Sequence, residues 1–286
     1  MRIGHTAVTW PNDRLEDAVA AIAAEGYWGT ETFGWVLEEW ASAGKNLYEE
    51  LEKLDLELTG LYCHLDLIRR DIRRDEIDQV MKWVDLFAPF DSPIVVVGGK
   101  MFDRVGFVWR EHARNVIETL NELAKRIADR GKACCFHPHT WTAAEKEEEI
   151  REALETTDAE TVFFAPDVGQ FAKGGADPLP LLRDYREKIR MVHLKDYIGG
   201  PIEMNEQGRE IDKTGFLGYV PLGLGSVDLD GALAILEASG YDGYISAELD
   251  GNQWSATRYG NPMMSQAEAI RASKAFLLER GYEFKR

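Results

Sequence analysis

The sequence has few cysteines and no long apolar run. Its 286 residues include only Cys63, Cys134 and Cys135, and an odd, sparse count with an adjacent pair does not make a disulfide framework. Cys134 and Cys135 lie in a strand-like run and are expected to be small core residues. No run approaches the ~20 apolar residues that span a bilayer, and residues 1–5 lack the apolar core of a secretory signal. We therefore expect a reduced, cytoplasmic protein with no membrane partner.

Positive charge is also scarce. The chain has 33 Lys and Arg residues against 50 Asp and Glu residues, so its formal net charge is -17. Nucleic-acid phosphates are bound by basic faces, so this composition argues against a nucleic-acid partner. It does not identify a substrate, because most of the acidic residues are expected on the solvated surface. The hydrophobic content of 45% is enough for a sizeable core.

Strand-like and helix-like segments alternate along the chain. Each of eight short apolar runs is followed by apolar residues at helical spacing. The expected strands are 2–10, 28–33, 57–63, 93–97, 132–136, 161–165, 190–194 and 244–250, and the expected helices are 15–23, 47–54, 70–87, 109–130, 145–156, 178–185, 229–239 and 265–281. Eight such pairs predict an α/β fold, a closed (β/α)8 TIM barrel, built as one domain over residues 1–286. The glycine-rich segment at about 196–226 is expected to be a long loop on the active face that covers a substrate.

Three expected strands end on a side chain of the metal-binding type: Asp167, His193 and Glu248. The active site of such a barrel lies at the C-terminal ends of its strands, so we expect these three side chains to converge on one ion. A mixed oxygen and imidazole shell suits Mn²⁺, Co²⁺, Mg²⁺ or Fe²⁺ better than structural zinc, and Mn²⁺ is our first expectation. Ordinary hydrogen bonding at the rim is the alternative.

The fourth ligand and the acid/base group are left open. His137 follows strand five directly and could be a ligand. Alternatively, His137 or His139 is a general acid/base, since an unperturbed imidazole titrates near the working pH. Glu145 could be the fourth ligand instead, although a carboxylate at a helix N-terminus is also favourable by itself. Lys195 points to the same side as His193 and could stabilise an oxyanion, or it pairs with a rim carboxylate.

Other polar and aromatic residues at the expected strand ends are candidates for contact with a substrate. They are Trp10, Glu31, His64, Trp141 and Gln170. Four of the six histidines fall at these ends, which is more than chance placement suggests. Aromatic walls suit the faces of sugars, but aromatic residues are equally common in packing.

The second half of the chain carries motifs of a known family. They are His137-Pro138-His139 with Thr142, Asp167-Val168-Gly169-Gln170, His193-Leu194-Lys195-Asp196, the Pro-Leu-Gly-Leu-Gly-Ser-Val-Asp run at 221–228, and Gly240-Tyr241-Asp242-Gly243 leading to Glu248. With these motifs the chain resembles the xylose isomerase-like (sugar phosphate isomerase/epimerase) superfamily and, within it, the inosose dehydratase group.

The resemblance implies a divalent ion held by residues of strands five to eight. In the superfamily these are Glu, Asp, His and Glu. Asp167, His193 and Glu248 match the last three, and His137 stands in place of the first glutamate. Relatives often form oligomers, so a homo-oligomer and a hetero-oligomer are both open.

The chemistry that the resemblance implies is proton removal next to a carbonyl of a sugar or cyclitol, through an enediolate. His137 or His139 would be the base, Lys195 would hold the oxyanion, and Glu248 takes the place of a glutamate that acts as acid/base in the superfamily's epimerases. Return of the proton gives isomerisation or epimerisation. Loss of a β-substituent gives dehydration, or release of the aglycone from a 3-keto-glycoside. A non-catalytic sugar-binding barrel is the other interpretation.

Overall fold

A computed structural model describes residues 1–198, 218–250 and 264–285 of the chain. The strands are β1 Arg2–Thr6, β2 Gly29–Phe33, β3 Glu57–Leu65, β4 Ile94–Gly99, β5 Ala133–His137, β6 Val162–Phe164, β7 Met191–Tyr197, β8 Tyr219–Val220 and β9 Tyr244–Glu248. The helices are α1 Leu15–Ala24, α2 Gly34–Ser42, α3 Leu47–Lys53, α4 Arg73–Leu86, α5 Trp109–Ala128, α6 Glu147–Thr156, α7 Val168–Gly174, α8 Pro178–Asp184, α9 Leu229–Ala238 and α11 Gln266–Leu278. No helix in these ranges is long and apolar enough to cross a membrane.

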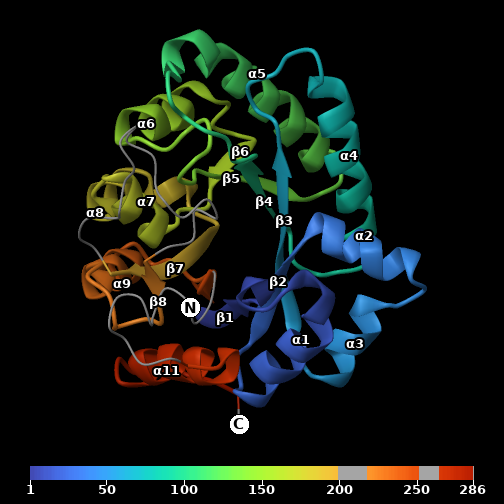
Figure 1. Cartoon of the computed structure of the whole chain (residues 1–286), viewed down its shortest axis with the longest axis vertical. Helices are drawn as coiled ribbons and strands as arrows, with labels where there is room; N and C mark the ends of the chain where they lie inside the picture. The colour runs from blue at the N-terminus through green and yellow to red at the C-terminus, as the bar shows by residue number, and fades with distance from the viewer. Residues whose placement is uncertain (199–217, 251–263, 286) are drawn as a thin grey trace.

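The strands other than β8 form a parallel barrel that the helices surround (Figure 1). The order in the sheet is β6-β5-β4-β3-β2-β1-β9-β7-β8, so the last long strand pairs with the first. Two parallel bridges, Phe164 with Ile189 and Asp167 with His193, connect the β6 side to the β7 side. The predicted (β/α)8 TIM barrel is confirmed, and the C-terminal ends of its parallel strands meet at one face.

Several expected boundaries are wrong. The first strand ends at Thr6 rather than Trp10, because the chain turns into a 3₁₀ helix at Ala7–Thr9. Helices α2 and α7 were missed, since each is short and begins at or within a few residues of a strand end. Part of the expected loop at 196–226 is regular instead, because β8 pairs antiparallel with the end of β7. Residues 199–217 of that loop lie outside the described residues.

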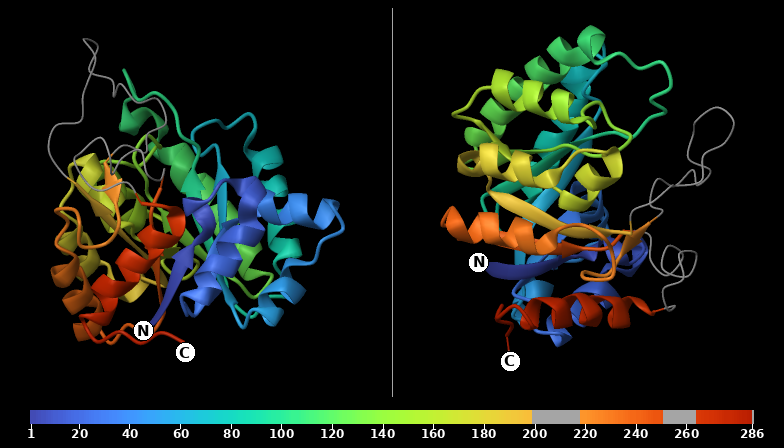
Figure 2. Two further views of the ribbon diagram at one scale, coloured as in Figure 1. Left: turned by 60° about the horizontal axis from the view of Figure 1, so that its bottom comes forward. Right: turned by 90° about the vertical axis from the view of Figure 1, so that its left-hand side faces the viewer.

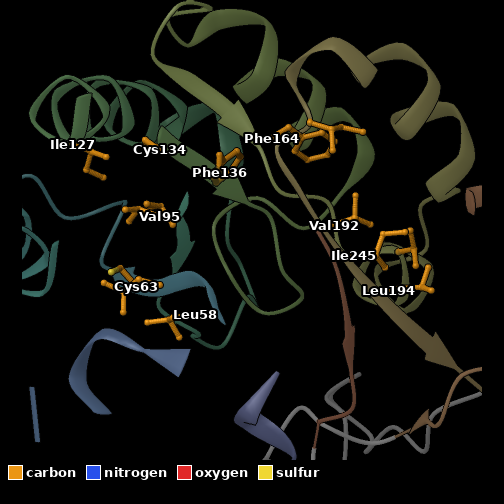
Figure 3. Packing of buried hydrophobic residues seen from close by; sticks show 14 of the residues in the cluster. Leu58, Cys63, Val95, Ile127, Cys134, Phe136, Phe164, Val192, Leu194 and Ile245 are labelled. Carbon is orange, nitrogen blue, oxygen red and sulfur yellow. The ribbon is translucent and has the colours of Figure 1, made fainter. Parts of the chain in front are cut away.

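The strand side chains divide between two hydrophobic layers, because successive residues point to opposite faces. Outward-pointing residues pack between the barrel and the helices; Figure 3 shows Cys134 and Phe136 of β5 and Val192 and Leu194 of β7 in this layer. The inward-pointing residues fill the barrel axis in a separate cluster. That cluster consists of Ile94, Val96, Cys135, Ala165 and Met191. All three cysteines are buried and free, as predicted for the adjacent pair.

The C-terminal segment packs against the turn before β2. Helix α11 lies beside α1 (Figure 2), and the Lys285 N–H donates to the Gly26 carbonyl at 2.7 Å. Gly26 has a φ of +77°, and a Cβ there would collide with the Lys285 carbonyl. Only glycine adopts a positive φ without strain and also leaves room for the Lys285 carbonyl. The turn before β2 therefore also binds the C-terminal segment.

The buried histidine on β1 should make the folded protein sensitive to acid. His5 is completely buried, with Nδ1 2.9 Å from the Thr6 carbonyl and its ring edge-on to Tyr27. Burial lowers the pKa of His5 to about 4, whereas an unfolded histidine titrates near pH ~6.5. The unfolded chain therefore binds a proton in this window that the folded chain does not. The free energy of unfolding should fall, from this group, by about 1.4 kcal/mol per pH unit as the pH drops from 6.5 towards 4.

Urea unfolding at pH 7, 6 and 5 measures this dependence. His5→Gln cannot titrate, so its unfolding free energy should fall less steeply than that of the wild type. Equal slopes for the two proteins would show that His5 does not contribute.

Candidate active site

A cavity of about 580 Å³ opens at the C-terminal ends of the barrel strands. Its apolar lining includes Phe33, Trp35 and Tyr62, and the rings of Phe33 and Trp35 stack with their centroids 4.2 Å apart. His64 also lines the cavity and lies against Trp35. Flat aromatic surfaces beside polar groups suit a ring-shaped ligand with both C–H and hydroxyl faces.

Four candidate metal ligands converge beside this cavity. One ligand atom from each of His137, Asp167 and His193 lies within 4.8 Å of the others. The fourth, Glu248, places Oε2 2.7 Å from His193 Nδ1. His137 and Glu248 end β5 and β9, His193 lies within β7, and Asp167 lies just beyond β6 as the N-cap of α7. The structure thus brings together the residues that the sequence analysis grouped. The expectation that the seventh strand ends on His193 is wrong, because β7 continues to Tyr197, where it pairs with β8.

Hydrogen bonds fix which ring nitrogen of each histidine is free. His137 Nδ1 lies 3.0 Å from the Ala165 carbonyl, and His193 Nε2 lies 2.9 Å from a carboxylate oxygen of Glu31. Carbonyl and carboxylate oxygens only accept, so these nitrogens carry the hydrogen. His137 Nε2 is therefore the atom available to a metal. His193 Nδ1 faces the Glu248 carboxylate at 2.7 Å and becomes available when it gives up its own hydrogen.

Three atoms at this point lack an aligned hydrogen bond. They are Asp167 Oδ2, His193 Nδ1 and Glu248 Oε2, and all are buried. Each still lies within ion-pair distance of a charged neighbour: Asp167 Oδ2 is 3.0 Å from Lys195 Nζ, and Glu248 Oε2 is 2.7 Å from His193 Nδ1. Buried polar atoms in folded proteins are nearly always hydrogen-bonded, so poorly aligned contacts among metal-ligand atoms at one place fit a shared cation.

The local charge also fits a cation. The carboxylates of Glu31, Asp167, Glu248 and Asp250 number four, against two cationic side chains, His193 and Lys195, which leaves a surplus of two negative charges when all are ionised. Buried charges need partners. When His193 gives up its proton to bind an ion, the surplus becomes three negative charges, and a divalent ion would offset two of them.

The pKa shifts of the buried histidines show which of them are neutral and which is held protonated by carboxylates. Burial, helped by the neighbouring His193, lowers the pKa of His137 well below its usual range. Burial also lowers the pKa of His139 to about 3. For His193, burial alone would lower the pKa, but Glu31 and Glu248 outweigh it and raise the pKa well above its usual range. An ion at Nδ1 would take the place of the His193 proton there.

Lys195 lies beneath the candidate ligands rather than on the cavity wall. It is completely buried, and Nζ lies 3.0 Å from Asp167 Oδ2, 3.1 Å from Glu248 Oε1 and 2.5 Å from Asp250 Oδ2. These carboxylates outweigh burial and raise the pKa of Lys195. A Cβ on Gly169 would lie 2.7 Å from Lys195 Cγ, so glycine in that motif makes room for the lysine. Its contacts orient carboxylates, while the predicted oxyanion role has no contact that supports it.

The structure gives two other predicted residues partners outside the metal cluster. Gln170 is buried, and its Oε1 accepts from Thr140 Oγ1 at 2.6 Å and from the Tyr219 hydroxyl at 2.5 Å. Glu145 accepts the Trp141 N–H at 2.7 Å and contacts the Lys146 ammonium at 2.6 Å. Gln170 and Glu145 are therefore not part of the proposed site.

Only some of the predicted substrate contacts line the cavity. Glu31 and His64 line the cavity, as does His139. Trp10 and Trp141 do not appear among the described lining residues: Trp10 packs in the hydrophobic core, and Trp141 sits in a left-handed backbone conformation with a φ of +66°. Trp10 does not continue β1, because a 3₁₀ turn follows the strand and changes the direction of the chain.

Tyr62 was missed by the sequence analysis. It lines the cavity and lies two residues before His64 on β3, so the strand period of two would have placed it on the same face. The Tyr62 ring packs edge-on to His137 with centroids 5.4 Å apart. A Cβ on Gly98 would collide with the Tyr62 hydroxyl, so a glycine on β4 accommodates this side chain.

Asp196 connects two of the sequence motifs, the one that ends at Asp196 itself and the run at 221–228. Its carboxylate accepts the backbone N–H groups of Gly223 and Gly225 at 2.9 Å and of Val227 at 3.2 Å. A Cβ on Gly225 would collide with this carboxylate. The aspartate after Lys195 therefore folds the 221–228 run against the end of β7, which is a structural role.

Comparisons with known proteins agree with this architecture. The model of the family described as "Xylose isomerase-like TIM barrel" matches residues 19–280. An inosose dehydratase of Geobacillus thermodenitrificans (strain NG80-2) is 32% identical over 277 residues, which cover 87% of this chain and 90% of that protein. Among solved structures, the IolI protein with a bound zinc atom has a TM-score of 0.75 at 20% identity, covering 98% of this chain and 97% of that one. The 3-keto-D-glucoside 4-epimerase YcjR from E. coli has a TM-score of 0.74 at 17% identity, covering 98% and 99%.

Proposed function

Because the chain belongs to the xylose isomerase-like TIM barrel family, we propose that it is a divalent-metal-dependent enzyme that removes a proton next to the carbonyl of a keto sugar or cyclitol. The observation that carries this proposal is the convergence of His137, Asp167, His193 and Glu248 beside an aromatic-lined cavity, with buried ligand atoms that lack aligned partners.

The proposed ligand set is His137 Nε2, Asp167 Oδ2, His193 Nδ1 and Glu248 Oε2. A bound divalent ion supplies Lewis-acid polarisation of a ketone oxygen, which makes the neighbouring C–H more acidic. Two imidazoles beside two carboxylates suit Mn²⁺, Fe²⁺, Co²⁺ or Zn²⁺. Mn²⁺ stays our first prediction among them.

His139 is the proposed proton acceptor. It lines the cavity, and its Nδ1 lies 2.6 Å from the Thr140 carbonyl, which leaves Nε2 as the acceptor nitrogen. Burial lowers its pKa to about 3, which keeps the ring neutral but also weakens it as a base, so its place on the cavity wall is what supports this role. Glu248, which also lines the cavity, is the second proposed acid/base group.

We propose dehydration of an inosose-type cyclitol as the reaction. The curated relative that shares 32% of its residues with this chain is an inosose dehydratase. After proton removal, the β C–O bond would break and the hydroxyl would leave as water, with a proton donated by the second acid/base group, Glu248. The likeness to a 3-keto-D-glucoside 4-epimerase supports epimerisation as the second candidate, in which the proton returns to the opposite face.

Metal analysis and solvent-deuterium exchange test the proposal together. The purified protein is assayed for bound metal before and after chelation, and then incubated in deuterated buffer with inososes, ketohexoses and 3-keto-glucosides. We expect one ion per chain and deuterium at the carbon next to the carbonyl of one substrate class. The product, dehydrated or epimerised, then decides the reaction. Protein that binds no metal and exchanges no proton would contradict the proposal and favour a non-catalytic barrel.

Two single variants separate metal binding from proton transfer. His137→Ala should lose the ion, because it removes a proposed ligand. His139→Gln should keep the ion but lose deuterium exchange by about 10²-fold or more, the usual contribution of a general base. Loss of metal in His139→Gln, or normal exchange in it, would show that the two roles are assigned to the wrong histidines.

A further inference from the structure

Glu31 reaches His193 from the far side of the barrel mouth. Glu31 is on β2 and His193 on β7, and two strands, β1 and β9, separate them in the sheet. Glu31 Oε2 nevertheless lies 2.9 Å from His193 Nε2, with the two side chains only 3% and 2% exposed. Within the described ranges, His193 is the one hydrogen-bond partner of the Glu31 side chain. A carboxylate buried this deeply is held by a specific contact rather than by solvent.

The sheet beside Glu31 carries a bulge. Along β2, Thr30 pairs with Leu58 of β3, but Glu31 pairs with Gly60, so the extra residue, Thr59, lies on β3. The Thr59 hydroxyl donates to the Thr30 carbonyl at 2.9 Å. Such bulges add local twist and are common next to active sites. The register change therefore falls at the step from Thr30 to Glu31, beside the residue whose carboxylate reaches His193.

We propose that Glu31 is a positioning residue for His193, with the carboxylate holding the hydrogen on Nε2 so that Nδ1 faces the ion. The proposal rests on the proposed function, because it takes His193 as a metal ligand. The ring of His193 lies 4.6 Å from that of His137, centroid to centroid, so the two proposed histidine ligands are neighbours. The hydrogen bond that His193 Nε2–H donates to Glu31 opposes rotation of the ring and raises the basicity of the imidazole. This role differs from the substrate contact that the sequence suggested for Glu31.

Titration calorimetry of the chelator-treated protein with Mn²⁺ and with Zn²⁺ tests the proposal. Glu31→Ala should weaken the metal by about 10–100-fold, the typical cost of removing the group that orients a ligating histidine. Glu31→Gln should recover part of this loss, since its amide oxygen can accept the same hydrogen without the charge. It also keeps the side-chain volume and stays informative if Glu31→Ala does not fold. In the diamagnetic Zn²⁺ form, ¹⁵N-resolved NMR should show the His193 Nε2 hydrogen in the wild type and its loss in Glu31→Ala.

Glu57→Gln is the matched control, because Glu57 is a carboxylate at the opposite end of the barrel, hydrogen-bonded to Tyr244. Its metal affinity should equal that of the wild type. Wild-type affinity in both Glu31 variants, with a raised KM for the substrate, would overturn the positioning role and leave Glu31 as a substrate contact. A wild-type protein that binds no metal would overturn this role and the proposed function together. Metal binding by the wild type with unchanged binding by the variants would overturn this role alone.

Discussion

Replacing Glu248 with glutamine should nearly abolish turnover and weaken metal binding at the same time. Glu248 Oε2 faces His193 Nδ1 at 2.7 Å, and Oε1 lies 3.1 Å from Lys195 Nζ. The substitution keeps the shape but removes a negative charge from the ligand set. We expect metal affinity to fall at least ~100-fold, beyond the usual cost of losing an outer partner. The exchange rate should fall about 10²–10⁴-fold, the usual range for an acid/base group.

Metal content, calorimetry and the deuterium-exchange assay measure these changes in one set of samples. Glu237→Gln is the control, since Glu237 is a surface carboxylate that accepts from the Tyr282 hydroxyl on the outside of the barrel. The control should bind metal and exchange protons as the wild type does. Normal metal content and normal exchange in Glu248→Gln would remove Glu248 from the site.

Replacing Lys195 with methionine should strongly destabilise the metal-free protein. The ammonium is completely buried between Asp167, Glu248 and Asp250. Methionine has a similar length but no charge, so three carboxylates would be left close together without their common partner. Removing one member of a buried ion pair typically costs about 3–5 kcal/mol. We expect a loss of this size in the free energy of unfolding, measured by urea in the presence of a chelator.

Saturating metal should recover part of the lost stability in Lys195→Met, because an ion that binds only the folded state stabilises it. The control is Lys45→Met, which breaks an exposed ion pair with Glu16 whose side chains are 50% and 62% exposed. Such surface pairs contribute at most about 1 kcal/mol. Equal stability of Lys195→Met and the wild type would mean that the lysine does not compensate these carboxylates.

Alternation along the chain was enough to predict the barrel. The run at 94–97 is apolar on both faces, and the structure buries every residue of β4. The two-residue alternation of side chains along a strand also predicted correctly that His193 and Lys195 lie on one face of β7, with Val192 and Leu194 on the other. Short helices such as α7 escaped detection, because seven residues following a strand end carry too little periodicity to be read as a helix.

The sequence by itself determined the fold class, the face on which the site is proposed, and the grouping of Asp167, His193 and Glu248, which the structure brings close together. These follow from local patterns that repeat along the chain. Tertiary structure alone decided the pairing of Glu31 with His193, the burial of Lys195 among three carboxylates, and the removal of Trp10 from the cavity. These contacts join residues that are distant in the sequence, or depend on a turn of three residues, and closing the barrel is what sets their distances.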